Sequence, residues 1–301
     1  MNRLLVWYGE LGTAGSILRR GLMFLLPALL WLLVFLILPG LALVAVAFAE
    51  RGSFGEILWN FSLENLSRLL GYGIFGWSPD NLIILARTVW VAFITTLISV
   101  LLAYPLAFFI ASRKLHQRYV WLALVIIPFW TNLVIRTYAW QLLFAPQLPF
   151  AQIAAALHLI EPGTALNPSS FAVYVGMVSA FLPFVVLPLY SSVERLDWSL
   201  VEAAQDLYGS RSRVFFQAIL PQTLPGLTVG VILTFIPAMG MFVVPDLLGG
   251  AKYLLVGNLI QQQFFSSRDW PFGAALSLGL VLLTLIALQI YRRSGKEVDL
   301  V

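Results

Sequence analysis

The chain has 301 residues, of which 60% are hydrophobic and 11% are charged. Soluble domains are about half apolar and about a quarter charged, so this composition excludes an ordinary soluble protein and predicts an integral membrane protein. The absence of cysteine excludes disulfides and thiolate metal sites. A net charge of +4, scattered along the chain, does not indicate a nucleic-acid-binding protein.

Six stretches are long and apolar enough to cross a bilayer, which takes about 20 helical residues. They predict an all-α membrane protein in which residues 21–291 form one domain of six transmembrane helices. Residues 1–20 precede this domain and residues 292–301 follow it. The predicted spans are 21–49 (interrupted at Pro39-Gly40), 82–110, 119–144, 171–190, 225–248 and 271–291.

The distribution of Lys and Arg predicts the orientation of the chain. With the N-terminus inside, twelve of these residues lie in cytoplasmic segments and four lie in outer loops. Because positive charge is retained on the cytoplasmic side, we expect residues 1–20 and the tail 292–301 to be cytoplasmic. The first apolar run is too long for the core of a cleaved signal peptide, so it predicts an uncleaved membrane anchor.

Two outer loops carry short helical patterns. Ser62 is placed to cap a helix on which four leucines share a face, namely Leu63, Leu66, Leu69 and Leu70. The segment "FAQIAAALHLI" (150–160) is mostly apolar but too short to span, which predicts about three helical turns at the outer membrane interface.

A polar connection of unusual length, 191–224, joins the fourth and fifth spans on the cytoplasmic side. Ser199 and Glu202 have the spacing of a capping box, which predicts the start of a helix. Gly209 is a typical helix stop. The face expected to be apolar consists of Leu200, Ala204 and Leu207.

A second short helix is predicted at 211–220 and should be ended by Pro221 and Pro225. Its apolar face consists of Val214, Phe215, Ala218 and Ile219. The side chains expected to face outward from the two helices are Glu202, Gln205, Asp206, Arg211, Arg213 and Gln217. Such a helix pair suits either a solvated loop or a docking surface for a soluble protein, and the pattern alone leaves both readings open.

The stretch "EAAQDLYGSRSRVFFQAILP" (202–221) resembles the EAA loop of binding-protein-dependent ABC importer permeases. The matching residues are Glu202, Ala203, Ala204, Leu220 and Pro221. By strict counting the family glycine falls on Tyr208 and the family isoleucine on Ala218, whereas Gly209 and Ile219 stand one position later. The resemblance implies a coupling helix that enters a groove on a cytoplasmic ATPase, with coupling residues Glu202, Ala203, Ala204, Asp206, Tyr208, Gly209, Arg211 and Pro221.

Further blocks resemble the permeases of spermidine/putrescine importers, in particular the first of their two paired permease subunits. They include "PFWTNLVIRTYAWQ" (128–141), "LPFVVLPLYSSVERLDWSLVEAAQDL" (182–207) and "GNLIQQQF" (257–264). The resemblance implies a type I ABC importer permease (MetI-like) fold in a bacterial inner membrane, without a cofactor. The implied partners are a second permease subunit, an ABC ATPase dimer and a periplasmic substrate-binding protein. Related importers that share parts of these blocks carry amino acid-like amines or organophosphonates.

The sequence has no ATP-binding motif of its own. The phosphate-binding pattern G-x-x-x-x-G-K-[ST] does not occur, and none of the three lysines follows a glycine-rich loop. No Ser/His/Asp set or carboxylate pair suggests catalysis within the spans. The chain is therefore predicted to be a transport subunit that is not an enzyme and that takes its energy from a separate ATPase.

Ionisable and aromatic residues at outer depth suggest a substrate pathway. A polyamine pathway needs carboxylates and aromatic faces in place of lost water, and charged residues within spans are functional candidates. The candidate pathway residues are Trp130, Asn132, Arg136, Tyr138, Trp140 and Asp246. The aromatic residues also suit an interfacial belt. Arg136 would favour an anionic substrate unless it pairs with a carboxylate such as Asp246 or with one on the partner permease subunit.

Two other classes of membrane protein remain as alternatives at this stage. A carrier driven by an ion gradient usually places carboxylates or broken helices near the membrane midplane, and no acidic residue of this chain is predicted there. A structural or assembly protein would need no ATPase. Uptake by the purified chain alone would favour the carrier.

Overall fold

The computed structural model describes residues 24–73, 76–250 and 253–295, which are mostly helical. Among these described residues, five helices are long and apolar enough to cross a bilayer, and a sharply bent pair makes a sixth crossing if it is counted as one span. The five are Phe24–Ala47, α5 (Asp80–Ala111), α9 (Ser170–Glu194), Arg211–Met239 and the Trp270–Ile290 part of α14 (Trp270–Gly295). The bent pair is α6 (Leu115–Trp130) and α7 (Leu133–Leu143). The membrane class and helical architecture expected from the sequence are confirmed.

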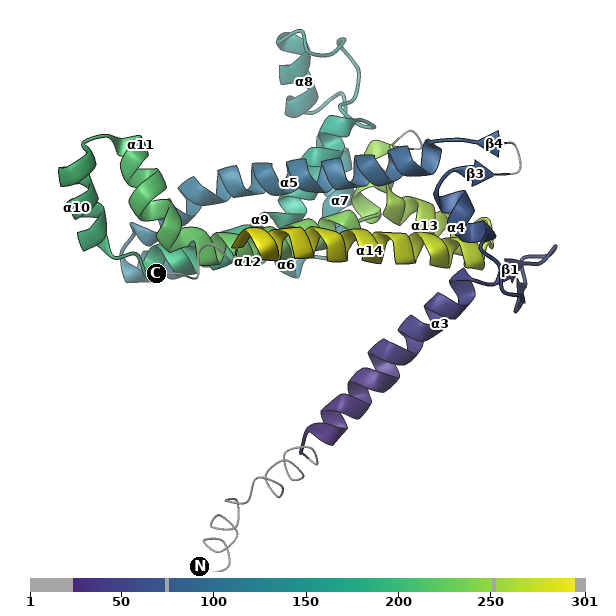
Figure 1. Cartoon of the computed structure of the whole chain (residues 1–301). Coiled ribbons are helices and arrows are strands. Elements are labelled where there is room, and N and C mark those ends of the chain that lie inside the picture. The colour runs from purple at the N-terminus through teal and green to yellow at the C-terminus, as the bar shows by residue number, and fades with distance from the viewer. Residues whose placement is uncertain (1–23, 74–75, 251–252, 296–301) are drawn as a thin grey trace, which may run out of the picture.

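The centre of the molecule is a bundle of α5, α9 and α12 (Leu220–Met239), which pack along one another with α14 beside them (Figure 1). Small residues allow the close approach. Gly226 lies against the carbonyl of Pro188, and Gly230 lies against Val185, so that a larger side chain at either glycine would collide with α9. Small residues four positions apart are a common means of packing helices in membranes, where the hydrophobic effect does not drive helix association.

The first apolar helix diverges from this bundle (Figure 1). It consists of a helical start at Phe24, a wide π turn η2 (Leu33–Ile37) and α3 (Leu38–Ala47). The predicted interruption at Pro39-Gly40 is wrong, because the helix continues through both residues. The wide turn η2 just before Pro39 makes room for the proline ring and leaves a turn in which the N–H that proline lacks is not required. At its C-terminal end Leu43, Val46 and Ala47 pack on Ala274, Ala275 and Leu278 of α14.

The predicted span 119–144 is not one straight helix, because α6 and α7 meet at an angle of 95°. Asn132 begins α7 as its N-cap, and its side-chain oxygen accepts the N–H of Val134 at 2.8 Å. The carbonyl of Pro128 near the end of α6 accepts a hydrogen bond from Arg136 of α7 at 2.8 Å. Side chains thus satisfy the backbone groups that the break would otherwise leave unpaired.

The helix after the connection 191–224 is longer than predicted. The expected end at Pro221 is wrong, because α11 (Arg211–Val214), the π turn η3 (Phe215–Ile219) and α12 follow one another without interruption. A proline ring clashes with the carbonyl four residues before it. For Pro221 this is the carbonyl of Gln217, which lies within the wide turn η3.

Both ends of the predicted fifth span 225–248 are therefore displaced. The helix starts at Arg211 and ends at Met239, and the chain then turns into η4 (Pro245–Gly249). The connection outside the long helices shortens from 191–224 to 195–210, because Ser191–Glu194 belong to α9.

Short elements cover the end of the bundle that lies away from the connection 195–210 (Figure 1). They comprise the hairpin β1 (Glu50–Arg51) and β2 (Ile57–Leu58), the hairpin β3 (Tyr72–Gly73) and β4 (Gly76–Trp77), α4 (Glu64–Leu69) and α13 (Val256–Phe265). The hydroxyl of Ser62 accepts the N–H of Glu64 at 3.2 Å, but the predicted cap is displaced, because the N-cap of α4 is Leu63. The predicted leucine face is not packed as a unit, because Leu69 is buried whereas Leu63, Leu66 and Leu70 are exposed. α8 (Pro149–Ala156) is shorter than the expected three turns and projects sideways from the bundle (Figure 1).

Candidate coupling surface and transport pathway

α10 (Trp198–Tyr208) lies outside the long helices, at the end of the bundle away from the hairpins (Figure 1). Its N-cap is Asp197, whose carboxylate accepts the N–H of Ser199 at 2.9 Å and its hydroxyl at 2.7 Å. The predicted capping box of Ser199 and Glu202 is therefore wrong, since a carboxylate two residues earlier takes the capping position. The Ser199 hydroxyl, and then the Ser199 amide, hold the pKa of Asp197 below its usual range.

Gly209 ends α10, as the sequence predicts. Its φ of +65° is left-handed, a conformation that glycine adopts without steric cost. Ser210 then caps α11 by accepting the N–H of Arg213 at 3.4 Å. Tyr208 is the last residue of α10, and its side chain lies outside the described part of the chain. The turn at the family's glycine position is made here one residue later.

The buried face of α10 differs from the predicted one. Val201 and Ala204 are buried and contact Val214, Ala218 and Ile219 of the following helix. The predicted face of that second helix is thus confirmed for these three residues. Leu200 and Leu207 are 54% and 79% exposed, so their predicted burial with Ala204 is wrong. Small Val201 and Ala204 side chains let the two helices approach more closely than leucines would.

The outward face of α10 and α11 combines charge with exposed apolar area. Every side chain predicted to face outward is exposed: Glu202, Gln205, Asp206, Arg211, Arg213 and Gln217. Ala203 and Pro221 are also exposed, whereas Ala204 is buried. Leu207 and Trp198 project from the same element. A cavity of about 480 Å³ opens at the turn between α10 and α11 and is lined by Gln205, Gly209, Ser210, Arg211, Val214 and Ile219. Apolar side chains ringed by polar ones are typical of a protein interface.

The six candidate pathway residues have different surroundings. Trp130, at the end of α6, is 84% exposed, and Tyr138 of α7 is 50% exposed. Asn132 is held by its capping role. Trp140 faces inward, where its indole N–H donates to the hydroxyl of Ser179 at 2.9 Å and its ring packs against the core. Trp130 and Tyr138 are therefore exposed, whereas Trp140 is part of the packing.

The suggested pair of Arg136 and Asp246 does not form. Arg136 donates to the Pro128 carbonyl and lies 5.8 Å from the ring centre of Phe129. Asp246 is exposed in η4, which packs against α7. The Arg136 guanidinium bonds the Pro128 carbonyl at the break between α6 and α7. This structural role explains the position of Arg136 without an anionic substrate.

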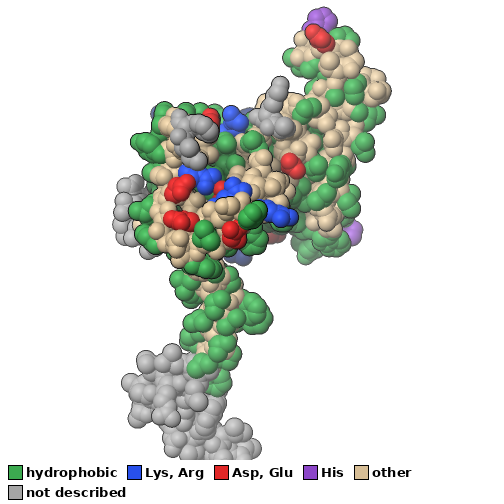
Figure 2. Space-filling model, turned by 90° about the vertical axis from the view of Figure 1, so that its right-hand side faces the viewer, with side chains coloured by type: hydrophobic (Ala, Val, Ile, Leu, Met, Phe, Trp, Pro, Cys, Tyr) green, Lys and Arg blue, Asp and Glu red, His purple; other side chains and the backbone are tan. Residues whose placement is uncertain are grey.

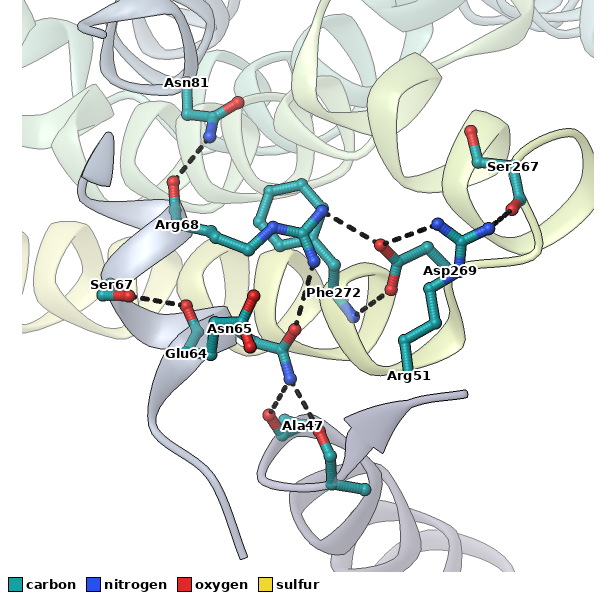
Figure 3. Close-up of polar contacts among 11 residues, drawn as sticks. Ala47, Arg51, Glu64, Asn65, Ser67, Arg68, Asn81, Ser267, Asp269 and Phe272 are labelled. Atoms are coloured by element: carbon teal, nitrogen blue, oxygen red, sulfur yellow. Dashed lines mark hydrogen bonds and ion pairs between the residues drawn. The ribbon is translucent and has the colours of Figure 1, made fainter. Parts of the chain in front are cut away.

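A polar cluster at the hairpin end was not predicted from the sequence (Figure 3). The carboxylate of Asp269, 1% exposed, accepts hydrogen bonds from Arg68 at 2.9 Å and from the N–H of Phe272 at 3.2 Å. Nη1 of Arg51 lies 3.8 Å from Oδ2 of the same Asp269 carboxylate. Asn65 donates to the carbonyls of residues 47 and 49. The cluster ties the end of α3 and α4 to the start of α14, and Asp269 two residues before "PF" is the helix-start signal that could have indicated it.

Charged side chains gather on this end of the molecule, while hydrophobic side chains cover the described part of the diverging first helix (Figure 2). A cavity of about 720 Å³ opens beside the cluster and is lined by Glu50, Arg51, Glu64, Asn65, Arg68, Tyr72 and Asp269, among others. The described residues contain no group of three or more side chains that could hold a metal ion.

Comparison with known proteins gives the family. Residues 93–299 match the family model described as "Binding-protein-dependent transport system inner membrane component". The spermidine/putrescine transport system permease protein PotB of Escherichia coli is 39% identical over 266 residues, which cover 88% of this chain and 94% of the relative. The protein of the same name from Haemophilus influenzae is 38% identical over 88% of this chain and 91% of its own length.

A solved structure supports the fold independently of close sequence similarity. A bacterial alginate ABC transporter, in complex with an alginate pentasaccharide-bound periplasmic protein, contains a chain with a TM-score of 0.69 and 14% identity. The match covers 95% of this chain and 98% of the other. Together with the family match over two thirds of its length, this places the chain among the inner-membrane permease components of binding-protein-dependent ABC transport systems.

Proposed function

We propose that this chain is the permease subunit of an ATP-driven importer that carries polyamines such as spermidine and putrescine into a bacterial cell. The observation that carries the proposal is the 39% identity, over 88% of the chain, to permeases named for spermidine and putrescine transport. The proposal places both termini in the cytoplasm, in agreement with the distribution of Lys and Arg.

The proposed energy source is a separate ATPase dimer that binds the outward face of α10 and α11. The coupling residues are Glu202, Ala203, Asp206, Gly209 and Arg211, with Ala204 packed beneath them and Tyr208 and Pro221 at the edges. The absence of a phosphate-binding loop from the sequence makes such a partner necessary for ATP-driven transport. When ATP closes the ATPase dimer, movement of α10 switches the spans between outward and inward access.

The other proposed partners are a second permease subunit and a periplasmic binding protein. The diverging first helix presents apolar side chains along its length, for example Phe24 at 76% exposed and Trp31 at 64% exposed. Lipid or a neighbouring permease must cover them in the membrane. The alginate transporter with a similar fold was solved with its periplasmic protein bound, which supports the same kind of partner here.

A weak cationic path is proposed along Trp130, Tyr138 and Asp246. Aromatic faces and a carboxylate attract ammonium groups. Arg136 and Asn132 shape this path by holding the break between α6 and α7, and Trp140 supports it from the core. Selectivity then rests chiefly with the periplasmic binding protein.

Reconstitution of the full complex in proteoliposomes tests the proposal. We expect binding protein loaded with spermidine or putrescine to stimulate ATP hydrolysis and uptake, and unloaded binding protein not to do so. Stimulation by an organophosphonate or an amino acid-like amine, but by neither polyamine, would show that polyamines are not the substrate. Uptake by the purified chain without an ATPase would reject the ATP-driven mechanism.

A further inference from the structure

The helix that leaves the coupling surface contains an unusual joint at η3 (Phe215–Ile219). In a π turn the backbone bonds run from i to i+5, and such turns are frequent at functional sites. Here side chains bond the carbonyls at its end. The amide of Gln222 donates to the carbonyl of Ala218 at 2.9 Å, and the hydroxyl of Thr223 lies 3.1 Å from the carbonyls of Ile219 and Leu220.

The same two side chains connect the joint to the neighbouring helices. The oxygen of Gln222 accepts the N–H of Asp197, the N-cap of α10, at 3.0 Å. The hydroxyl of Tyr104 on α5 lies 2.9 Å from that of Thr223. Either hydroxyl can donate in this bond, and the Thr223 oxygen can accept while its own hydrogen is given to a helix carbonyl. The Tyr104 ring also contacts Phe215 edge-on, with ring centres 5.6 Å apart.

This geometry makes one continuous path from the coupling surface into the membrane. Thr223 is fully buried, so its hydroxyl bonds are not exchanged for water. A change of η3 between π and α spacing would shift the Ala218 and Ile219 carbonyls relative to residues 222 and 223. The bonds of Gln222 and Thr223 therefore depend on the register of the joint.

We propose that Gln222, Thr223 and Tyr104 are positioning residues that transmit movement of α10 to α12 and α5 through the η3 joint. The inference rests on the proposed coupling of α10 to an ATPase and adds residues that lie inside the bundle, away from the docking face.

The first test compares Thr223→Val and Tyr104→Phe in the reconstituted complex. Each variant removes one hydroxyl with little change of shape, and Thr223→Ser restores it. A net hydrogen bond shifts an equilibrium by roughly two- to tenfold, so we expect the ratio of stimulated to basal ATP hydrolysis to fall by about that factor. Complex yield and basal hydrolysis should be unchanged, Thr223→Ser should behave as wild type, and the double variant should be no worse than Thr223→Val. An unchanged ratio, or equal losses of basal and stimulated activity, would overturn the inference.

The second test does not depend on the transported solute. Hydrogen exchange of backbone amides 215–223 is measured in the full complex with and without trapped nucleotide. We expect exchange in this segment to change on trapping in the wild type, and the change to be lost in Thr223→Val. Equal exchange in both nucleotide states of the wild type would overturn the inference. If Glu202→Lys on the docking face uncouples transport while Thr223→Val does not, the proposed function stands and the joint is not the route.

Discussion

Asp269 is a buried carboxylate whose main partner, Arg68, is only partly buried. In Asp269→Asn the amide oxygen can still cap α14, but the charged bond to Arg68 is lost. Hydrogen bonds to charged groups contribute about 1.5–3 kcal/mol, so we expect the complex to be destabilised by up to about 3 kcal/mol. Thermal unfolding of the detergent-solubilised complex measures this loss. The matched control is Glu64→Gln in the same cavity, where the carboxylate is exposed and little change is expected.

The pH dependence of α10 follows from its N-cap. The pKa of Asp197 is lowered in the folded protein, so its contribution to stability is present above the usual carboxyl pKa of about 3.9 and is lost as pH falls through the lower folded value. Coupling should therefore not change between about pH 5 and pH 8 through this group. Asp197→Ala should increase hydrogen exchange over residues 198–203 at neutral pH, whereas Asp197→Asn should preserve the cap. Equal exchange in the two variants would show that the side chain does not hold the helix start.

At the scale of elements, α10 presents one face to the bundle and the other to solvent. Glu202→Lys reverses a charge on the exposed face and leaves the packing of Val201 and Ala204 intact. A loss of about 1.4 kcal/mol in docking weakens the contact tenfold. We expect the variant to insert normally and to lose most of its uptake per ATP, measured in proteoliposomes. Glu161→Lys, an exposed position in the loop after α8, is the matched control, and normal coupled uptake by Glu202→Lys would remove the docking role.

The break between α6 and α7 depends on Arg136. The Pro128 carbonyl accepts from both Arg136 and the Thr131 hydroxyl, so Arg136→Leu removes one of two donors and should cost at most about 1 kcal/mol. Arg136→Lys keeps a donor and should retain more of the stability. Thermal unfolding measures the structural role of Arg136, and uptake of a panel of cationic and anionic solutes measures any role in substrate preference. A change of solute preference with no loss of stability would instead assign Arg136 to the substrate.

The elements were predictable where local chemistry decided them, as at Gly209 and in the long apolar runs. They were not predictable where a contact with a distant residue, or the surroundings of a proline, decided whether a helix continued or ended. Pro221 ends a helix in most contexts, yet here η3 accommodates it and the helix continues. The break at Asn132 needed three cooperating side chains inside a stretch whose composition reads as one span.

At the scale of the whole molecule, the orientation in the membrane is open to a direct test. The chain has no cysteine, so a single introduced cysteine can be labelled without background. We expect a membrane-impermeant maleimide to label Ser53→Cys, in the β1–β2 hairpin loop, in spheroplasts. Ser212→Cys in α11 should react only after the membrane is permeabilised. The reverse pattern would place the coupling surface outside and would exclude its contact with a cytoplasmic ATPase.

The outward polar residues of α10 and α11 could be identified from periodicity, because exposure repeats with the helix. The cluster around Asp269 could not, because Arg68 and Asp269 lie 201 positions apart and only the folded chain brings them together. No sequence pattern indicated a role for Gln222 either. Its role follows from the hydrogen bond that its side-chain oxygen accepts from the N–H of Asp197 in the folded chain.

The unbroken path from Arg211 to Met239 has a mechanical consequence. Its α12 part has 20 residues, about 30 Å at 1.5 Å per residue, so a tilt of about 10° at one end displaces the other by about 5 Å. In the proposed mechanism the helix would therefore act as a lever, since a small angular step at the end near α10 becomes a displacement of about 5 Å at the other end.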